Sequence, residues 1–226
     1  MLQLILSLFL LPAVMQDARH LLDPKLVPMN GATTKAFVPK GWKSQDEQTG
    51  DLNGDDLPDA VLQLIEDKPV RDAKDEFQER QRAMLILFKT ADGNYRRAAV
   101  ANRLLMCASC GGMLGGTGEY PVGEVKIEKG VLIVSQLAGS RNATDLLQRF
   151  RYDPATKKFL MIGQDVNNFD RMTGESEVVS TNYLTGKQVI EKKQYNPKTD
   201  KYVTTAQKTK VVPKTRKSIE QVDYEQ

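Results

Sequence analysis

The sequence predicts a mainly β protein, either an antiparallel sandwich or a strongly curved sheet, with a calcium-binding hairpin and few short helices. Short apolar or alternating runs of strand length recur along the chain. Turn-forming residues separate these runs, as in Lys129-Gly130 and in residues 153–156, 184–186 and 196–200. No stretch shows helical periodicity over more than two turns. Together these observations favour hairpin-connected strands.

The expected strands can be placed in order from this pattern. They cover residues 60–65, 83–88, 95–100, 122–128, 131–137, 146–152, 158–163, 177–183, 187–195 and 201–206. Residues 66–79 are rich in charge and contain Pro69, so they read as an exposed connection. Trp42 is expected to anchor the core.

The simplest division of the 226 residues has four parts. Residues 1–18 form a signal peptide, residues 19–31 a linker, residues 32–206 the β-domain, and residues 207–226 a basic flexible tail. Residues 1–15 are almost wholly apolar, too short to span a bilayer, and followed by polar residues. A buried N-terminal helix is the alternative to a signal peptide. The mature chain is expected to have no transmembrane segment.

The segment from Asp51 to Asp59 has the spacing of a calcium loop. Calcium takes six to eight oxygen ligands, and alternating side chains of a tight loop converge on one point. The expected ligands are side chains at relative positions 1, 3, 5 and 9 and one backbone carbonyl: Asp51, Asn53, Asp55, Asp59 and, through its carbonyl, Leu57. Leu62 stands where an EF-hand needs a bidentate glutamate, and an apolar strand follows, so the setting is a β-hairpin. An acidic Asx turn without metal is the alternative.

This loop resembles the calcium hairpin of FG-GAP and VCBS-type repeats, whose pattern is close to D-h-[DN]-x-D-G-x-x-D before an apolar strand. Asp56 replaces the usual glycine at the sixth position, where the backbone needs a positive φ, so weak affinity is expected. Only one such loop is present, which argues against a complete propeller.

A wider similarity rests on residues 37–42, 150–152 with 160–163, and 180–187. They resemble a family of uncharacterised exported bacterial proteins that contain a single calcium hairpin of this kind. The resemblance spans most of residues 37–187. It implies a secreted or periplasmic location and implies no activity.

The two cysteines are Cys107 and Cys110, and glycines follow them closely. An exported chain meets an oxidising compartment, so a disulfide is expected. A redox centre is the alternative, but it needs a lowered thiol pKa, usually from a helix N-terminus, and the glycines disfavour a helix.

Function is less defined than fold. His20 is the single histidine, which argues against Ser-His-Asp, Cys-His and histidine-ligated zinc chemistry. A net charge of +3 does not indicate a nucleic acid partner, and none is expected. The sequence leaves the question of an enzyme open and favours a secreted or periplasmic, non-enzymatic β-domain with one structural Ca²⁺ and no organic cofactor.

Two other functions remain open. In one, the basic hairpin and tail within residues 187–217 dock an anionic envelope component, although a solvated hairpin would have the same composition. In the other, the chain is an enzyme: a hydrolase that uses Asp165 and Asp170, or a thiol oxidoreductase that uses Cys107 and Cys110.

Overall fold

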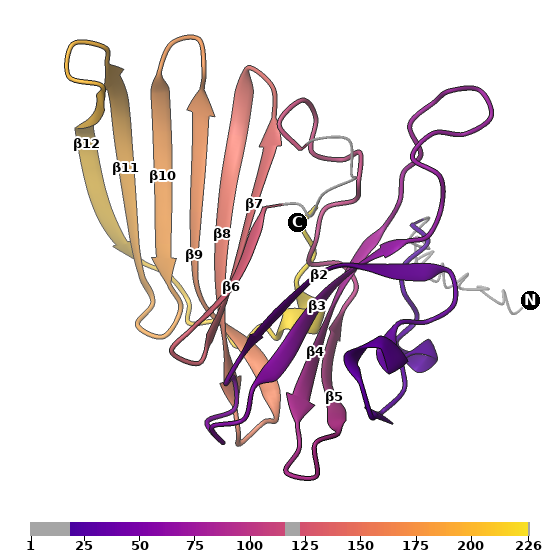
Figure 1. Ribbon diagram of the computed structural model, residues 1–226. Helices are drawn as coiled ribbons and strands as arrows, with labels where there is room; N and C mark the ends of the chain where they lie inside the picture. The colour runs from indigo at the N-terminus through magenta and orange to yellow at the C-terminus, as the bar shows by residue number, and fades with distance from the viewer. Residues whose placement is uncertain (1–18, 116–122, 226) are drawn as a thin grey trace, which may run out of the picture.

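A computed structural model describes residues 19–115 and 123–225 (Figure 1). The expected signal peptide, residues 1–18, lies outside the described residues. The strands form two sheets and all pair in antiparallel fashion. This confirms the mainly antiparallel β prediction. No helix within the described ranges has the length and apolar character needed to cross a membrane.

The elements follow one another along the chain with few helical turns. The strands are β1 (Asn30–Gly31), β2 (Trp42–Gly50), β3 (Asp59–Glu66), β4 (Arg82–Lys89), β5 (Tyr95–Ala101), β6 (Glu124–Glu128), β7 (Val131–Gly139), β8 (Asn142–Asp153), β9 (Lys158–Asp170), β10 (Glu175–Asn182), β11 (Lys187–Asn196) and β12 (Lys201–Val211). The 3-10 turns are η1 (Pro24–Leu26), η2 (Thr34–Phe37) and η3 (Ile219–Gln221).

Both sheets are built largely from neighbours in sequence. The five-stranded sheet has the order β1-β5-β4-β3-β2, and the seven-stranded sheet runs from β12 to β6 without a crossover. The turn chemistry explains this order. Lys129 and Gly130, for example, have φ values of 50° and 72°, the left-handed geometry that a two-residue hairpin requires.

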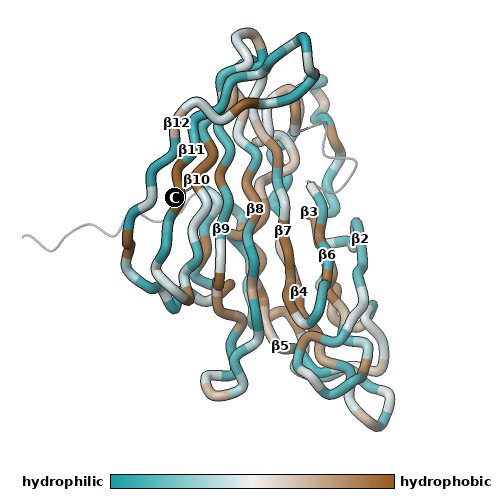
Figure 2. The backbone as a smooth tube through the Cα atoms, turned by 90° about the vertical axis from the view of Figure 1, so that its left-hand side faces the viewer, coloured by the Kyte–Doolittle hydropathy of each residue, from teal (hydrophilic) through white to brown (hydrophobic). Residues whose placement is uncertain are grey.

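The main core lies between one face of the five-stranded sheet and the β6–β9 part of the larger sheet. Met84 and Ile86 of β4 pack in one cluster with Leu132 and Val134 of β7, and Figure 2 shows hydrophobic stretches along both strands. The rings of Phe88 and Tyr152 meet edge to face, with centroids 4.9 Å apart, within the same cluster. The core therefore joins the two sheets.

The second core lies on the opposite face of the five-stranded sheet. Leu22, Val27 and Phe37 cover this face together with Trp42, which is 8% exposed. Trp42 is thus a core anchor, as expected. Residues 19–31 differ from the expected linker, because Leu22 and Val27 are buried there. With a core on each side, β3 is buried along its whole length, which accounts for its continuous apolar run.

The strands β10, β11 and β12 continue the larger sheet beyond the core. In Figure 1 they form its outer end, with β12 at the edge. Every residue of β12 is exposed, and most residues of β11 are only half-buried. We call these three strands the exposed extension. It is a part of the sheet on which no second layer packs within the described residues.

The C-terminal residues do not form the expected flexible tail. Residues 207–211 complete β12, and the chain then returns beneath the sheet (Figure 1). Ile219 and Val222 are 0% and 3% exposed in the main core, and Asp223 pairs with Arg19 at 2.7 Å. The tail prediction was wrong because charged and polar residues flank these two apolar anchors, basic ones before Ile219 and acidic ones after it. The spacing of three between the anchors matches the short η3 turn.

Candidate functional site

The Asp51–Asp59 segment is the connection between β2 and β3, which pair from Gly50 and Asp59 onward. The Asp51 carboxylate accepts backbone N–H groups of Asn53, Gly54 and Asp56 at 3.2, 2.7 and 3.1 Å. Burial acts to raise the pKa of Asp51, but these backbone hydrogen bonds outweigh it and the pKa is lowered. Asp51 therefore organises the first half of the loop as an ionised carboxylate.

The middle of the loop is held by the same kind of hydrogen bond, from a backbone amide to a nearby side-chain oxygen. Asn53 accepts the amide of Asp55 at 3.0 Å and donates to the Asp55 carboxylate at 2.9 Å. Asp55 in turn accepts the amide of Leu57 at 2.9 Å. Asp56 adopts a φ of 62°, so the sixth position has the left-handed backbone that the hairpin pattern demands, and an aspartate tolerates it there.

Asp59 is the one fully buried acid of the loop, at 0% exposure. Its two carboxylate oxygens accept the amides of Leu52 and Lys89, each at 2.9 Å. Burial raises its pKa to about 6, the two amide bonds act against this rise, and repulsion from Asp55 and Asp51 adds to it. A carboxylate oxygen has two lone pairs, so each Asp59 oxygen retains one further acceptor position.

The five expected metal ligands are thus brought into one hairpin. Their carboxylates are less tightly grouped than donors around an ion. Within residues 19–115 and 123–225, the one group of three or more His, Cys, Asp or Glu ligand atoms within 4.8 Å of one another is Glu79 with Cys107 and Cys110. Those two cysteines are disulfide-bonded and offer no thiolate. The acidic hairpin therefore remains the site with the oxygen chemistry that calcium prefers.

Cys107 and Cys110 form a disulfide, with their Cα atoms 5.1 Å apart. Cys107 is buried and Cys110 is exposed. The buried guanidinium of Arg82 donates to the backbone carbonyls of Met106 and Cys107, both at 3.1 Å. Burial, with repulsion from Arg80, lowers the pKa of Arg82 to about 10. Arg82 thus fixes the polypeptide just before the disulfide.

The glycines after the disulfide permit close backbone packing. A Cβ on Gly111 would lie 2.4 Å from the Cα of Gly115, and Gly139 donates its amide to the Gly111 carbonyl at 2.9 Å. Sequence reasoning anticipated the disulfide but missed Arg82 and Glu79. A charged residue at the start of the apolar β4 run was the available signal for Arg82.

The proposed acid pair of a hydrolase is not formed. Asp165 and Asp170 were expected in a loop, but both lie on β9. Five residues apart on a regular strand, they point to opposite faces of the sheet. Asp165 pairs with Arg149 at 2.8 Å and Asp170 with Arg141 at 2.9 Å. This removes the carboxylate pair as a catalytic centre.

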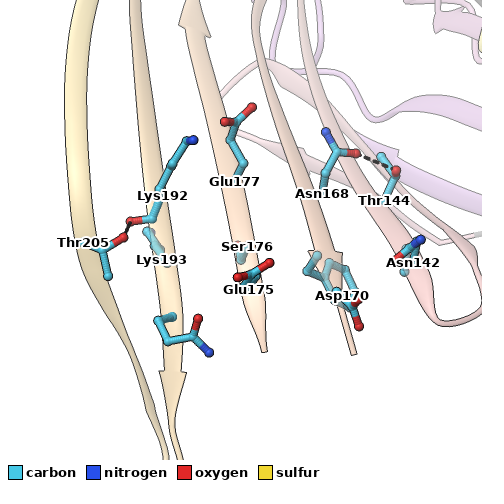
Figure 3. Close-up of a pocket in the computed structure, with 13 residues that line it drawn as sticks. Asn142, Thr144, Asn168, Asp170, Glu175, Ser176, Glu177, Lys192, Lys193 and Thr205 are labelled. Atoms are coloured by element: carbon cyan, nitrogen blue, oxygen red, sulfur yellow. Dashed lines mark hydrogen bonds between the residues drawn. The ribbon is translucent and has the colours of Figure 1, made fainter. Parts of the chain in front are cut away.

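A polar hollow of about 520 Å³ lies across the exposed ends of β8 to β11 (Figure 3). Thr144 donates to Asn168 at 2.7 Å, and Glu177 stands opposite Lys192 in the strand register. Figure 3 shows these side chains in a row on neighbouring strands. The lining mixes acids, amides and lysines and holds no cysteine or histidine, which gives it no nucleophile–base pair.

The fold and these sites define a two-sheet antiparallel β protein with an acidic hairpin and a disulfide-closed glycine loop. A scan against models of protein families finds no match, and a search of curated proteins finds none either.

Proposed function

We propose that this chain is a secreted or periplasmic, non-enzymatic β-domain protein in which the Asp51–Asp59 hairpin binds one structural Ca²⁺. The observation that carries the proposal is the geometry of the hairpin, in which successive side-chain to backbone hydrogen bonds of Asp51, Asn53 and Asp55 curl the chain into one loop that ends at the buried Asp59. The pKa of Asp59 is raised mainly by burial, and repulsion from Asp55 and Asp51 adds to the rise. The fold therefore gathers three acids where their mutual repulsion costs stability. A divalent cation reverses this term, because each carboxylate then faces a positive charge.

The ion would act on the fold rather than on a substrate. Asp51, Asn53 and Asp55 would supply side-chain oxygens, Leu57 its carbonyl, and Asp59 the buried end of the site. Metal binding to the folded state alone adds to the free energy of unfolding. We expect affinity in the range of extracellular modules, with a dissociation constant of about 10⁻⁴ to 10⁻³ M.

Three features support the proposed location. A disulfide persists in oxidising compartments, and Cys107 and Cys110 form one. Millimolar calcium, which a weak site requires, is also typical outside the cytosol. The almost wholly apolar residues 1–15 fit the same proposal as the main part of a signal peptide over residues 1–18.

The test is thermal unfolding of the disulfide-bonded protein in millimolar calcium and in chelator. We expect a higher melting temperature in calcium and a smaller effect of magnesium, which demands a stricter octahedral shell. Identical melting curves in all three conditions would refute the metal proposal. Retained folding in chelator would be compatible with it, because the two hydrophobic cores do not include the ion.

A second candidate function is favoured by the exposed extension. Eleven consecutive exposed residues of β12 include Lys201, Lys208 and Lys210 and no acid. We propose that this basic hairpin docks an anionic envelope component, because an unscreened row of lysines attracts polyanions at moderate salt. Neutralising Lys201, Lys208 and Lys210 of β12 together with Lys192, Lys193 and Lys198 should abolish salt-sensitive retention on an anionic polymer. Unchanged retention would exclude this function.

A thiol oxidoreductase is a weaker candidate. Cys110 is exposed to attack, but the described residues around it form turns rather than a helix N-terminus that would stabilise a thiolate. A negative insulin-reduction assay would set this alternative aside.

A further inference from the structure

A second cavity lies where the partner of β9 changes from one segment to another. β10 pairs with β9 up to Asn182 opposite Gly163, and Tyr183 still donates its amide to the Ile162 carbonyl at 3.0 Å. Beyond that point the C-terminal arm, residues 212–218, takes over. Met161 donates to the Lys217 carbonyl at 3.0 Å, and Ser218 bridges to Leu160.

The arm forms one wall of an open cavity as it crosses from β12 to β9. Val212 donates to the Gly186 carbonyl at 2.8 Å, which fixes the start of the arm against the β10–β11 turn. Its other end is fixed by Ile219, which is fully buried. Between these two anchors lies a cavity of about 690 Å³, a size that accommodates a small organic ligand.

The lining of this cavity has a cationic and an apolar part. The cationic part comprises Arg151 of β8 with Lys214 and Arg216 of the arm, against a single acid, Asp153. All three cationic side chains are exposed. Within residues 19–115 and 123–225, none of the three side chains forms an ion pair or a hydrogen bond. The charge of Arg216 already acts on Asp153 and helps to lower the pKa of that acid, so Arg151 and Lys214 carry the charge that is most available to a ligand.

The apolar part lies beside these cations. Met161 is buried, Tyr183 is half-buried, and Leu184 is 54% exposed at the cavity. Burial raises the pKa of Tyr183. The neutral Tyr183 hydroxyl does not repel an anion. A purely hydrated anion would leave this apolar lining unused, and an uncharged apolar ligand would leave the cations unused.

We propose that this cavity binds an anionic amphiphile, with its acidic group at Lys214, Arg216 and Arg151 and its apolar portion against Tyr183, Leu184 and Met161. Charge complementarity and the divided lining carry the proposal. The site is separate from the acidic hairpin and from the lysines of β11 and β12 described above. Its test is therefore independent of the tests of the proposed functions.

The experiment is a calorimetric titration of the disulfide-bonded protein with dodecyl phosphate at monomeric concentrations. We expect saturable binding of one molecule per chain. Inorganic phosphate tests the charge alone, and dodecyl maltoside tests the chain alone; both should bind about tenfold more weakly or worse. Equal affinity for inorganic phosphate would overturn the amphiphile assignment, as would unsaturable binding of many molecules per chain.

Variants locate the site. Lys214→Gln with Arg216→Gln should weaken dodecyl phosphate binding about tenfold. The matched control, Lys35→Gln with Lys40→Gln, removes the same charge from exposed residues that precede β2 and should change affinity less than about twofold. Equal losses in the two double variants would mean general attraction to a basic surface and would refute the cavity.

A third variant tests the apolar part of the cavity without touching its charge. Leu184→Ser should lower affinity for dodecyl phosphate about fivefold and leave the weak response to inorganic phosphate unchanged. Since Leu184 is 54% exposed, its replacement should leave the melting temperature near that of the parent chain. An unaltered affinity for dodecyl phosphate would contradict the proposal.

Discussion

The buried carboxylate of Asp59 accepts the backbone amide of Lys89 at 2.9 Å, across 30 residues of sequence. Its second oxygen accepts the amide of Leu52 at 2.9 Å within the acidic hairpin. One side chain thus ties the hairpin to the end of β4. Asp59 belongs to the fold as much as to the proposed calcium site, and the two roles have different experimental consequences.

Replacing Asp59 with alanine should destabilise the protein even in chelator. The change removes the acceptors of two amides in a buried setting, which we expect to cost about 2–4 kcal/mol of the free energy of unfolding. Chemical denaturation measures this loss. The matched control is Asp92→Ala in the β4–β5 turn, an exposed acid whose removal should cost much less than the removal of Asp59. Equal losses of unfolding free energy in the two variants would contradict the proposal that Asp59 ties the hairpin to the end of β4.

The pH dependence of stability should carry a signature of Asp59. Its folded pKa is raised from 3.8 to about 6, so between these values the folded state binds more protons than the unfolded state. Its contribution to stability therefore grows as pH falls from about 6 to about 4, by about 2 kcal/mol, and is lost as pH rises again.

The Asp59→Asn variant isolates this contribution, because asparagine does not titrate. Other acids, including Asp51 and Asp170, have lowered pKa values, so their contribution to the stability of the folded protein is lost as pH falls. In the parent chain this loss masks the gain that Asp59 provides. Subtracting the free energy of unfolding of the variant from that of the parent at each pH should reveal the rise toward pH 4. A flat difference would show that the Asp59 pKa is not raised.

Replacing both Asp51 and Asp55 with asparagine should abolish stabilisation by calcium. The change removes two charges from the proposed ligand set and keeps side chains that support Asx turns. The rise in melting temperature on adding millimolar calcium should fall to near zero. The control pair, Asp72→Asn with Asp75→Asn, alters two acids of the connection between β3 and β4 and should keep the full calcium response. A retained response in the Asp51 and Asp55 variant would place the ion elsewhere.

Removing the residues after Val211 should destabilise the whole domain. Ile219 and Val222 are buried in the main core, and deleting a buried aliphatic side chain typically costs about 2–5 kcal/mol. We expect the truncated chain to unfold at a much lower denaturant concentration or to fail to fold. Ile219→Ala is the milder form and should cost about 3 kcal/mol. A truncated chain as stable as the parent would restore the flexible-tail prediction.

The strands were predictable because their signals are local. Lys129 and Gly130, between two alternating runs, indicate a tight hairpin, and the largely apolar run of β3 indicates a strand by itself. The acidic loop was also visible, down to the strained backbone at Asp56. Short-range turn chemistry and periodicity therefore supplied most of the fold.

The parts that escaped prediction depend on distant partners. Nothing near Asp59 in sequence indicates that Lys89 will donate to it, and nothing near Ile219 indicates the core it enters. Asp165 and Asp170 were misassigned because their spacing in sequence was read without the strand alternation that separates them. Burial of Arg82 likewise depends on carbonyls about 25 residues away.

The C-terminal residues return to the core, so the exposed extension is anchored at both of its ends. The chain leaves the core along β9 and is pinned to that same strand again where Ser218 bridges Leu160. Everything between forms a closed loop with two fixed ends. If β12 separates from β11, the released chain is still held at both ends. It therefore gains less conformational entropy than a strand at a free terminus would gain on fraying. Docking of Ile219 and Val222 in the main core therefore links the most exposed strands to the most buried part of the fold.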